Sequence, residues 1–194
     1  MKLPKNAWLC LLALALPAQA VEFNRVLPER SRIAFVTTQM GTEVAGDFRA
    51  FRADLAFDPA RPASARTRIE IDLASVDAGS KAGNDAVKGA DWLHVAAHPQ
   101  ARFESTSVRA LGRGRYEVLG RLTIRGHNRE VKARFTFRQL DSQGLFEGRF
   151  NIKRLDYGIG QAVWGDTGVV SDVVRIRFRF VADSGVPPTA RRRP

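Results

Sequence analysis

Apolar and polar side chains alternate one by one over long stretches of this chain. From Val174 to Phe180, in the run VRIRFRF, every even position is apolar and every odd position is arginine. Successive side chains of a β-strand point to opposite faces, so this run predicts a strand with one apolar and one cationic face. The same alternation is found in residues 31–40, 68–76, 115–126, 129–139 and 148–158.

One stretch breaks the alternation. In GDFRAFRADLAFDP, Phe48 and Phe51 stand at positions of opposite parity, whereas Phe51, Leu55 and Phe57 are regular again. An extra residue near Ala50, such as a β-bulge, would return both phenylalanines to one face.

Turn signals between these runs indicate how the strands connect. Gly112–Gly114 and Gly126–Asn128 resemble hairpin connections, which predicts antiparallel neighbours. We count about eight strands, many of them near ten residues long, and long twisted antiparallel strands tend to coil and close. The predicted fold is therefore all-β, an antiparallel barrel of about eight strands over residues 21–183. A short helical insert, capped by Asn84 or Asp85 and ended by Pro99, lies between two strands.

The two ends of the chain differ from the barrel. Residues 1–20 combine Lys2 and Lys5, an apolar run and Ala18-Gln19-Ala20, which predicts a signal peptide cleaved after Ala20. We therefore expect an exported, periplasmic protein. Cys10, the single cysteine, would leave with the signal peptide, so no disulfide is expected. Residues 184–194, with two prolines and three adjacent arginines, are predicted to be a disordered basic tail.

An amphipathic barrel can point its apolar face inward, as soluble barrels do, or outward, as outer-membrane barrels do. The phenylalanines here are spread along the strands rather than gathered into two girdles, and the chain continues into a basic tail after its last strand. Both features favour an apolar interior. The expected lumen lining comprises Phe35, Phe48, Phe57, Ile71, Phe103, Leu122, Ile124, Phe135, Phe137, Phe150, Ile152, Ile176 and Phe178, with Trp164 at the mouth.

Two interiors remain compatible with this pattern. An eight-stranded barrel is just wide enough to fill with its own side chains or to hold one small ligand. An open lumen between such long strands would suit a long, thin, apolar molecule, whereas a filled core would leave a non-catalytic interaction or stress-response barrel.

The formal net charge is +11, which attracts anions in general. Nucleic acid is not an expected partner of an exported protein, and a peripheral contact with an anionic membrane stays open, as does the choice between monomer and homodimer. His94 and His98 have helical i, i+4 spacing, but Pro99 follows at once, so we expect no metal site. A hydrolase at the Tyr157–Trp164 rim would need a convergent acid–base pair; we find no catalytic series and expect no enzyme.

Several segments in a fixed order resemble the YceI-like periplasmic proteins. They are SRIAFVTTQMGTEVAGDFRAF, IEIDLASVDAG, HPQARFESTSV, LGRLTIRGHNREV and FNIKRLDYGIGQAVWGDTGVVSDVVRIRF, between residues 23 and 182. The resemblance implies an extended lipocalin-like barrel that binds a polyisoprenoid lipid in its pore, such as a polyprenyl diphosphate or the isoprenoid tail of a quinone. It implies no other cofactor.

Overall fold

The structure, a computed structural model, describes residues 21–185. The predicted signal peptide and residues 186–194 of the predicted tail lie outside the described residues. The last strand extends to Ser184, the first residue of the predicted tail, and Ser184 pairs with Phe23.

The described residues form eleven strands and one α-helix, with five short 3-10 turns. The strands are β1 (Phe23–Val26), β2 (Arg32–Gln39), β3 (Thr42–Phe48), β4 (Phe51–Phe57), β5 (Arg66–Asp72), β6 (Val76–Asp77), β7 (Gln100–Gly112), β8 (Arg115–Ile124), β9 (His127–Leu140), β10 (Gln143–Lys153) and β11 (Val173–Ser184). The helix is α1 (Lys81–Lys88), and the 3-10 turns are Pro28–Arg30, Pro62–Ser64, Leu73–Ser75, Arg154–Tyr157 and Ala162–Trp164.

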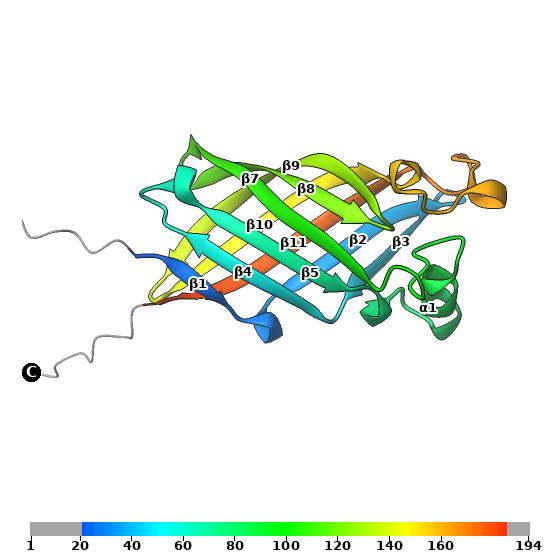
Figure 1. Ribbon diagram of the computed structural model, residues 1–194, viewed down its shortest axis with the longest axis horizontal. Coiled ribbons are helices and arrows are strands. Elements are labelled where there is room, and N and C mark those ends of the chain that lie inside the picture. The colour runs from blue at the N-terminus through cyan, green and yellow to red at the C-terminus, as the bar shows by residue number, and fades with distance from the viewer. Residues whose placement is uncertain (1–20, 186–194) are drawn as a thin grey trace, which may run out of the picture.

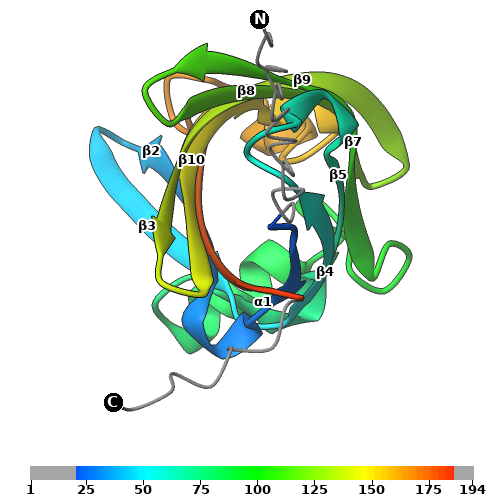
Figure 2. The same cartoon turned by 90° about the vertical axis from the view of Figure 1, so that its left-hand side faces the viewer.

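These eleven pieces make one closed, eight-stranded antiparallel barrel. Strands β1 and β2 both pair with β11, β4 pairs with β1, and β3 pairs with β2. Likewise, β5 pairs with β4 and β6 pairs with β3. The couples β1/β2, β3/β4 and β5/β6 therefore each form one long strand that is interrupted once. The ring runs on from β5 through β7, β8, β9 and β10 to β11. Figure 1 shows the elongated barrel from the side, and Figure 2 shows the ring from the end near β1. The predicted fold is confirmed.

The interruption between β3 and β4 is the step break expected near Ala50. Arg49 and Ala50 belong to neither strand, so the inward parity changes from even positions in β3 to odd positions in β4. Phe48 and Phe51 both pack against the interior cluster of apolar side chains as a result.

The wall has the expected polarity. On β9, Val131, Ala133, Phe135 and Phe137 are buried, whereas the residues between them are exposed. On β11 the arginines 175, 177 and 179 are exposed on the outer surface. Inward packing of large apolar side chains supplies most of the stabilisation that such a cysteine-poor barrel can have.

The helical insert begins earlier than predicted. Ser80, not Asn84 or Asp85, caps α1, and its Oγ accepts a hydrogen bond from the Gly83 N–H at 3.0 Å. The Asn84 side chain instead accepts from the Ala78 N–H at 2.6 Å. Ser80 can cap because its backbone is extended and its side chain accepts from the Gly83 N–H, whereas Asn84 and Asp85 lie inside the helix. In Figure 1, α1 lies across one end of the barrel, opposite the end at which β1 begins.

Candidate functional site: an apolar cavity in the barrel

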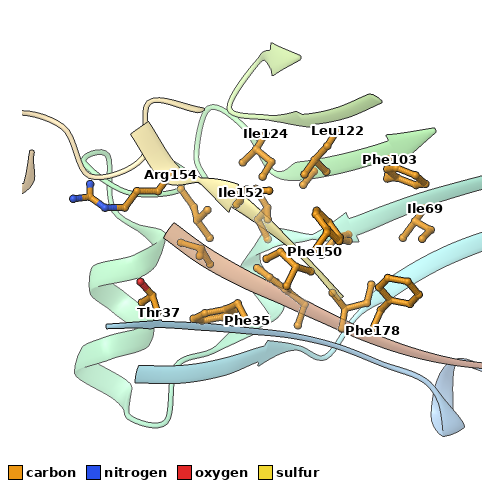
Figure 3. Close-up of a pocket in the computed structure, with 18 of the residues that line it drawn as sticks. Phe35, Thr37, Ile69, Phe103, Leu122, Ile124, Phe150, Ile152, Arg154 and Phe178 are labelled. Carbon is orange, nitrogen blue, oxygen red and sulfur yellow. The ribbon is translucent and has the colours of Figure 1, made fainter. Parts of the chain in front are cut away.

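A cavity of about 520 Å³ occupies the barrel interior. This volume lies within the range of about 300–1,000 Å³ that is usual for small-molecule sites. Its lining is almost wholly aliphatic and aromatic, with contributions from every long strand of the ring. Figure 3 shows Phe35, Phe103, Phe150 and Phe178 around it, with Thr37 and Arg154 toward the end that α1 covers.

An aromatic cluster closes the other end of the barrel. Phe57 is its centre, and its ring centroid lies 5.0 Å from that of Phe137, 5.1 Å from that of Phe146 and 5.2 Å from that of Tyr116. Phe23, which is fully buried, adds a ring 5.1 Å from Phe137. Edge-to-face contacts of this kind hold the rings in fixed positions. From this cluster the cavity extends toward α1, whose residues Gly83, Ala86 and Val87 line its far end.

The predicted lumen residues fall into two groups. Phe137 belongs to the closing aromatic cluster and does not line the cavity, whereas Phe57 and Phe135 belong to the cluster and also line it. All the others do: Phe35, Phe48, Phe57, Ile71, Phe103, Leu122, Ile124, Phe135, Phe150, Ile152, Trp164, Ile176 and Phe178. Their part in binding a ligand stays a prediction.

Three inward-facing glycines explain why so many phenylalanines leave the lumen open. A Cβ at Gly148 would lie 2.4 Å from Cζ of Phe178, the residue directly opposite on β11. Gly46 stands in the same relation to Phe35, and a Cβ at Gly120 would lie 2.4 Å from the ring of Phe103, which is diagonal to it on β7. Each ring therefore covers a glycine on the wall, an arrangement that strands use where bulk would not fit. The rings line the cavity instead of crossing it.

The mouth is framed by two tryptophans. The ring centroids of Trp92, which follows α1, and Trp164, in the turn Ala162–Trp164, are 5.6 Å apart. Both rings line the cavity. Together with Val87 of α1 they form an apolar entrance.

Arg154 holds the mouth loop, residues 154–172, in place. It is only 1% exposed, and its Nε and Nη2 atoms donate to the carbonyls of Ser171 (3.1 Å), Trp164 (2.7 Å) and Val170 (2.9 Å). Its Nη1 atom donates to the carbonyls of Ile159 and Gly160. All five N–H groups of the guanidinium are thus used. Burial lowers the pKa of Arg154, and Asp172 partly offsets this effect.

A second arginine joins the mouth loop to the helical insert. Arg125, in the β8–β9 hairpin, donates from Nη1 to the carbonyls of Trp92 and Gly158. The Gly160 N–H donates to the Asp91 carbonyl at 2.7 Å, which adds a direct link between loop and insert. The entrance is therefore a cross-linked collar.

The two aromatic residues of the rim considered above, Tyr157 and Trp164, lie in different surroundings. Trp164 borders the mouth as expected, but Tyr157 does not: its side chain is buried in an apolar cluster beside the barrel end. Its hydroxyl has no hydrogen-bond partner among the described residues, and burial raises the pKa of Tyr157 to about 12. The hydroxyl therefore stays protonated near neutral pH and cannot act as a base there.

The described residues also bear on metal binding and on membrane-spanning helices. Residues 21–185 contain no group of three or more His, Cys, Asp or Glu side chains placed to hold a metal ion; the rings of His94 and His98 lie 5.7 Å apart without a third such neighbour. Nor does this part of the chain include a helix long and apolar enough to cross a membrane.

Sequence reasoning missed several lining residues that the alternation itself marked. Arg154 follows Phe150 and Ile152 at the same parity, which already places its side chain on the inner face. Thr37 continues Ile33 and Phe35 in the same way toward the mouth. Other lining residues of this kind are Ile33, Leu55, Ile69, Val108, Val118, Ala133, Phe146, Val174 and Phe180.

The fold and cavity define a class, that of closed antiparallel barrels with an apolar lumen of ligand size. Within this class the chain belongs to the YceI-like family, since the family's domain matches residues 25–182. A UPF0312 protein of Azotobacter vinelandii is 32% identical over 151 residues, which are 73% of this chain and 79% of that protein. A UPF0312 protein of Yersinia pestis is 35% identical over 120 residues, or 59% of this chain and 62% of the relative.

Solved structures show the same barrel. BcnA of Burkholderia cenocepacia superposes with a TM-score of 0.79 at 38% identity, over 81% of this chain and 99% of BcnA. A polyisoprenoid binding domain from Saccharophagus degradans has a TM-score of 0.64 at 14% identity, over 86% of this chain and 99% of that domain. The second likeness concerns the fold alone.

Proposed function

We propose that this chain is an exported, non-enzymatic protein that binds one long isoprenoid lipid in its barrel lumen, and so stores, transports or sequesters that lipid in the periplasm. The observation that carries the proposal is the apolar cavity of about 520 Å³, which runs from the aromatic cluster at one end of the barrel to α1 at the other. The signal-peptide pattern of residues 1–20 supports the location.

Binding would be driven by burial of hydrocarbon. Each buried CH₂-sized unit contributes about 0.8 kcal/mol, so a chain of several isoprene units binds tightly without polar contacts. An open lumen favours this function over a filled interaction barrel. The polyisoprenoid binding domain of Saccharophagus degradans, which shares the fold, adds general support for a ligand of this class.

The charges of the lining residues bear on which lipid head group can enter the lumen. Arg154 is the one ionised side chain among the lining residues, and its N–H groups are all bound to carbonyls. A diphosphate drawn inside would have no free cation to pair with, which makes burial of its charge costly. A quinone, or a lipid whose charged end stays outside, fits the lumen better.

Native mass spectrometry tests the proposal. The purified protein is mixed with ubiquinone-8 and, separately, with undecaprenyl diphosphate. We expect a one-to-one complex with the quinone and weaker occupancy by the diphosphate. Failure of both probes to bind, in a protein that is also free of lipid when isolated, would overturn the proposal.

A matched pair of variants places the ligand in the lumen. Ile176 is half-buried and lines the cavity, so Ile176→Trp puts a large ring into the free space and is expected to reduce ubiquinone-8 occupancy at least about tenfold. Asn151→Trp puts the same ring on the exposed outer wall of β10 and should leave occupancy unchanged. Equal occupancy in both variants would place the lipid elsewhere.

A further inference from the structure

The outer wall carries a row of three directly opposed arginines. Arg149 of β10 pairs in register with Arg134 of β9 on one side and with Arg177 of β11 on the other. All three side chains are exposed. Neighbouring strands lie about 4.8 Å apart, so the guanidinium groups leave the sheet at closely spaced points, and like charges directly opposite each other are destabilising.

Acidic neighbours within residues 21–185 pair with only one arginine of this row, Arg134. Arg149, Arg177 and the adjacent Arg175 form no ion pair within residues 21–185. Arg134 has a long contact of 3.4 Å with Glu117, whose nearer partner is Arg109 at 2.7 Å. Free guanidinium groups on a wall are suited to bind phosphate groups, which they contact through two parallel N–H···O bonds.

The positive charge continues toward the mouth. Arg175 lies opposite Asn151, and the next outward-facing pair of this ladder is Lys153 and Val173. Lys132 and Lys153 are exposed as well. We call the set Lys132, Arg134, Arg149, Lys153, Arg175 and Arg177 the cationic wall.

Exposed apolar tips lie where the cationic wall meets the mouth. Met40 is 76% exposed at the β2–β3 turn, and its N–H donates to the Val169 carbonyl at 2.8 Å. Val169 and Val173 are themselves exposed, and Val163, 82% exposed, lies in the same mouth loop. In Figure 1 the β2–β3 turn and the orange mouth loop project from the same end of the barrel. Exposed apolar groups gathered at one site mark contacts with other molecules or membranes.

We propose that the cationic wall and these apolar tips dock the barrel, mouth first, onto a bilayer surface that contains anionic phospholipid. The arginines would contact lipid phosphates while Met40, Val163, Val169 and Val173 enter the headgroup region. Apolar tips beside cations are typical of proteins that lie at a membrane interface, whereas an acidic protein partner would need the cations alone. The inference concerns the outer surface and does not depend on which lipid the lumen holds.

Co-sedimentation with vesicles tests the docking. The protein is mixed with phosphatidylcholine vesicles that contain phosphatidylglycerol, and with vesicles of phosphatidylcholine alone, after intact mass has established where the N-terminus begins. We expect binding to the anionic vesicles that falls as salt rises. The variant R149Q/R177Q should bind at least about tenfold more weakly, because each cation near the surface raises the affinity several-fold.

A control with the same change of net charge is R68Q/R102Q. These arginines of β5 and β7 are ion-paired with Glu70 on another part of the wall, and the variant should bind like the unchanged protein. Arg191 to Arg193 are present in every variant and contribute equally. Equal loss in both variants, or no binding to anionic vesicles at all, would overturn the proposal.

A fluorescent label tests the orientation. In a chain whose single cysteine, Cys10, is replaced by Ser, an environment-sensitive dye is attached at M40C or, as the control, at L140C, which is exposed at the opposite end. We expect a blue shift on vesicle binding at position 40 and none at position 140. A shift at position 140 instead, or at neither position while the protein is bound, would exclude mouth-first docking.

Discussion

Single residues decide how the lumen stays open and how its mouth keeps its shape. Gly46, Gly120 and Gly148 give three phenylalanine rings a flat place on the wall. Arg154 acts differently, because it organises backbone: it gathers five carbonyls from residues that span positions 159 to 171. Without it, five buried or half-buried acceptors would have to find other donors.

Replacing Arg154 by Met should destabilise the protein by about 3–5 kcal/mol, because a buried polar centre is lost while its carbonyl partners remain. Urea unfolding followed by the fluorescence of Trp92 and Trp164 measures the free energy of unfolding. Lys153→Met, one residue earlier but exposed, is the control and should change it little. Equal stabilities of the two variants would contradict the organising role of Arg154.

At the scale of elements, the short strand β1 closes the ring. It bridges β11 and β4, with Val26 opposite Ala182 and Phe23 opposite Phe57. Four residues make few ladder hydrogen bonds, so the seam depends on the side chain of Phe23 within the closing aromatic cluster. The helix α1 at the mouth is similar, because eight residues are too few for a stable isolated helix. Its position therefore depends on the collar.

Phe23→Ala should therefore weaken the seam by about 3–5 kcal/mol, the usual cost of removing a buried phenylalanine. In the Phe23→Ala variant, hydrogen-exchange measurements should show that the amides of β1 and of Ala182 exchange faster than those of β8. Asn24→Ala, exposed on the same strand, should leave the exchange rates unchanged. Protection of β1 that survives Phe23→Ala would mean that the ladder alone holds the ring.

At the scale of the whole molecule, the outer wall is a network of arginines and carboxylates. Glu117 is buried between Arg109 and Arg134, and the Arg109 hydrogen bond is the main cause that lowers the pKa of Glu117. Arg68 lowers the pKa of Glu70, and Gln143 and Arg25 lower that of Asp183. The carboxylates of Asp58 and Asp77 also have lowered pKa values because they accept hydrogen bonds.

Stability should consequently fall in acid. A carboxyl group with a lowered folded-state pKa binds fewer protons when folded than when unfolded, so its contribution is present above its unfolded pKa and is lost as pH falls through the folded value. We expect the urea midpoint to be level near neutral pH and to drop below about pH 4.5. Glu117→Gln should make that drop smaller. A midpoint that rises on acidification would contradict this account.

Much of the fold and site was determined by the sequence alone. Alternation fixes which side chains of each strand face inward, so the barrel, the step break near Ala50 and most lining residues were predictable. Arg154 was missed although its parity marked it, because an arginine on an apolar face is unusual. Phe137 was misplaced because parity gives the face of a strand but not the depth along the barrel.

Only the tertiary structure decided the rest. Which end the aromatic rings close, how wide the lumen remains and which arginines stand opposite one another depend on strand register and shear, and these are relations between segments far apart in the chain. The ladder of Arg134, Arg149 and Arg177 cannot be read from three separate strands. Local alternation sets what a strand can present, and packing across the ring sets what it meets.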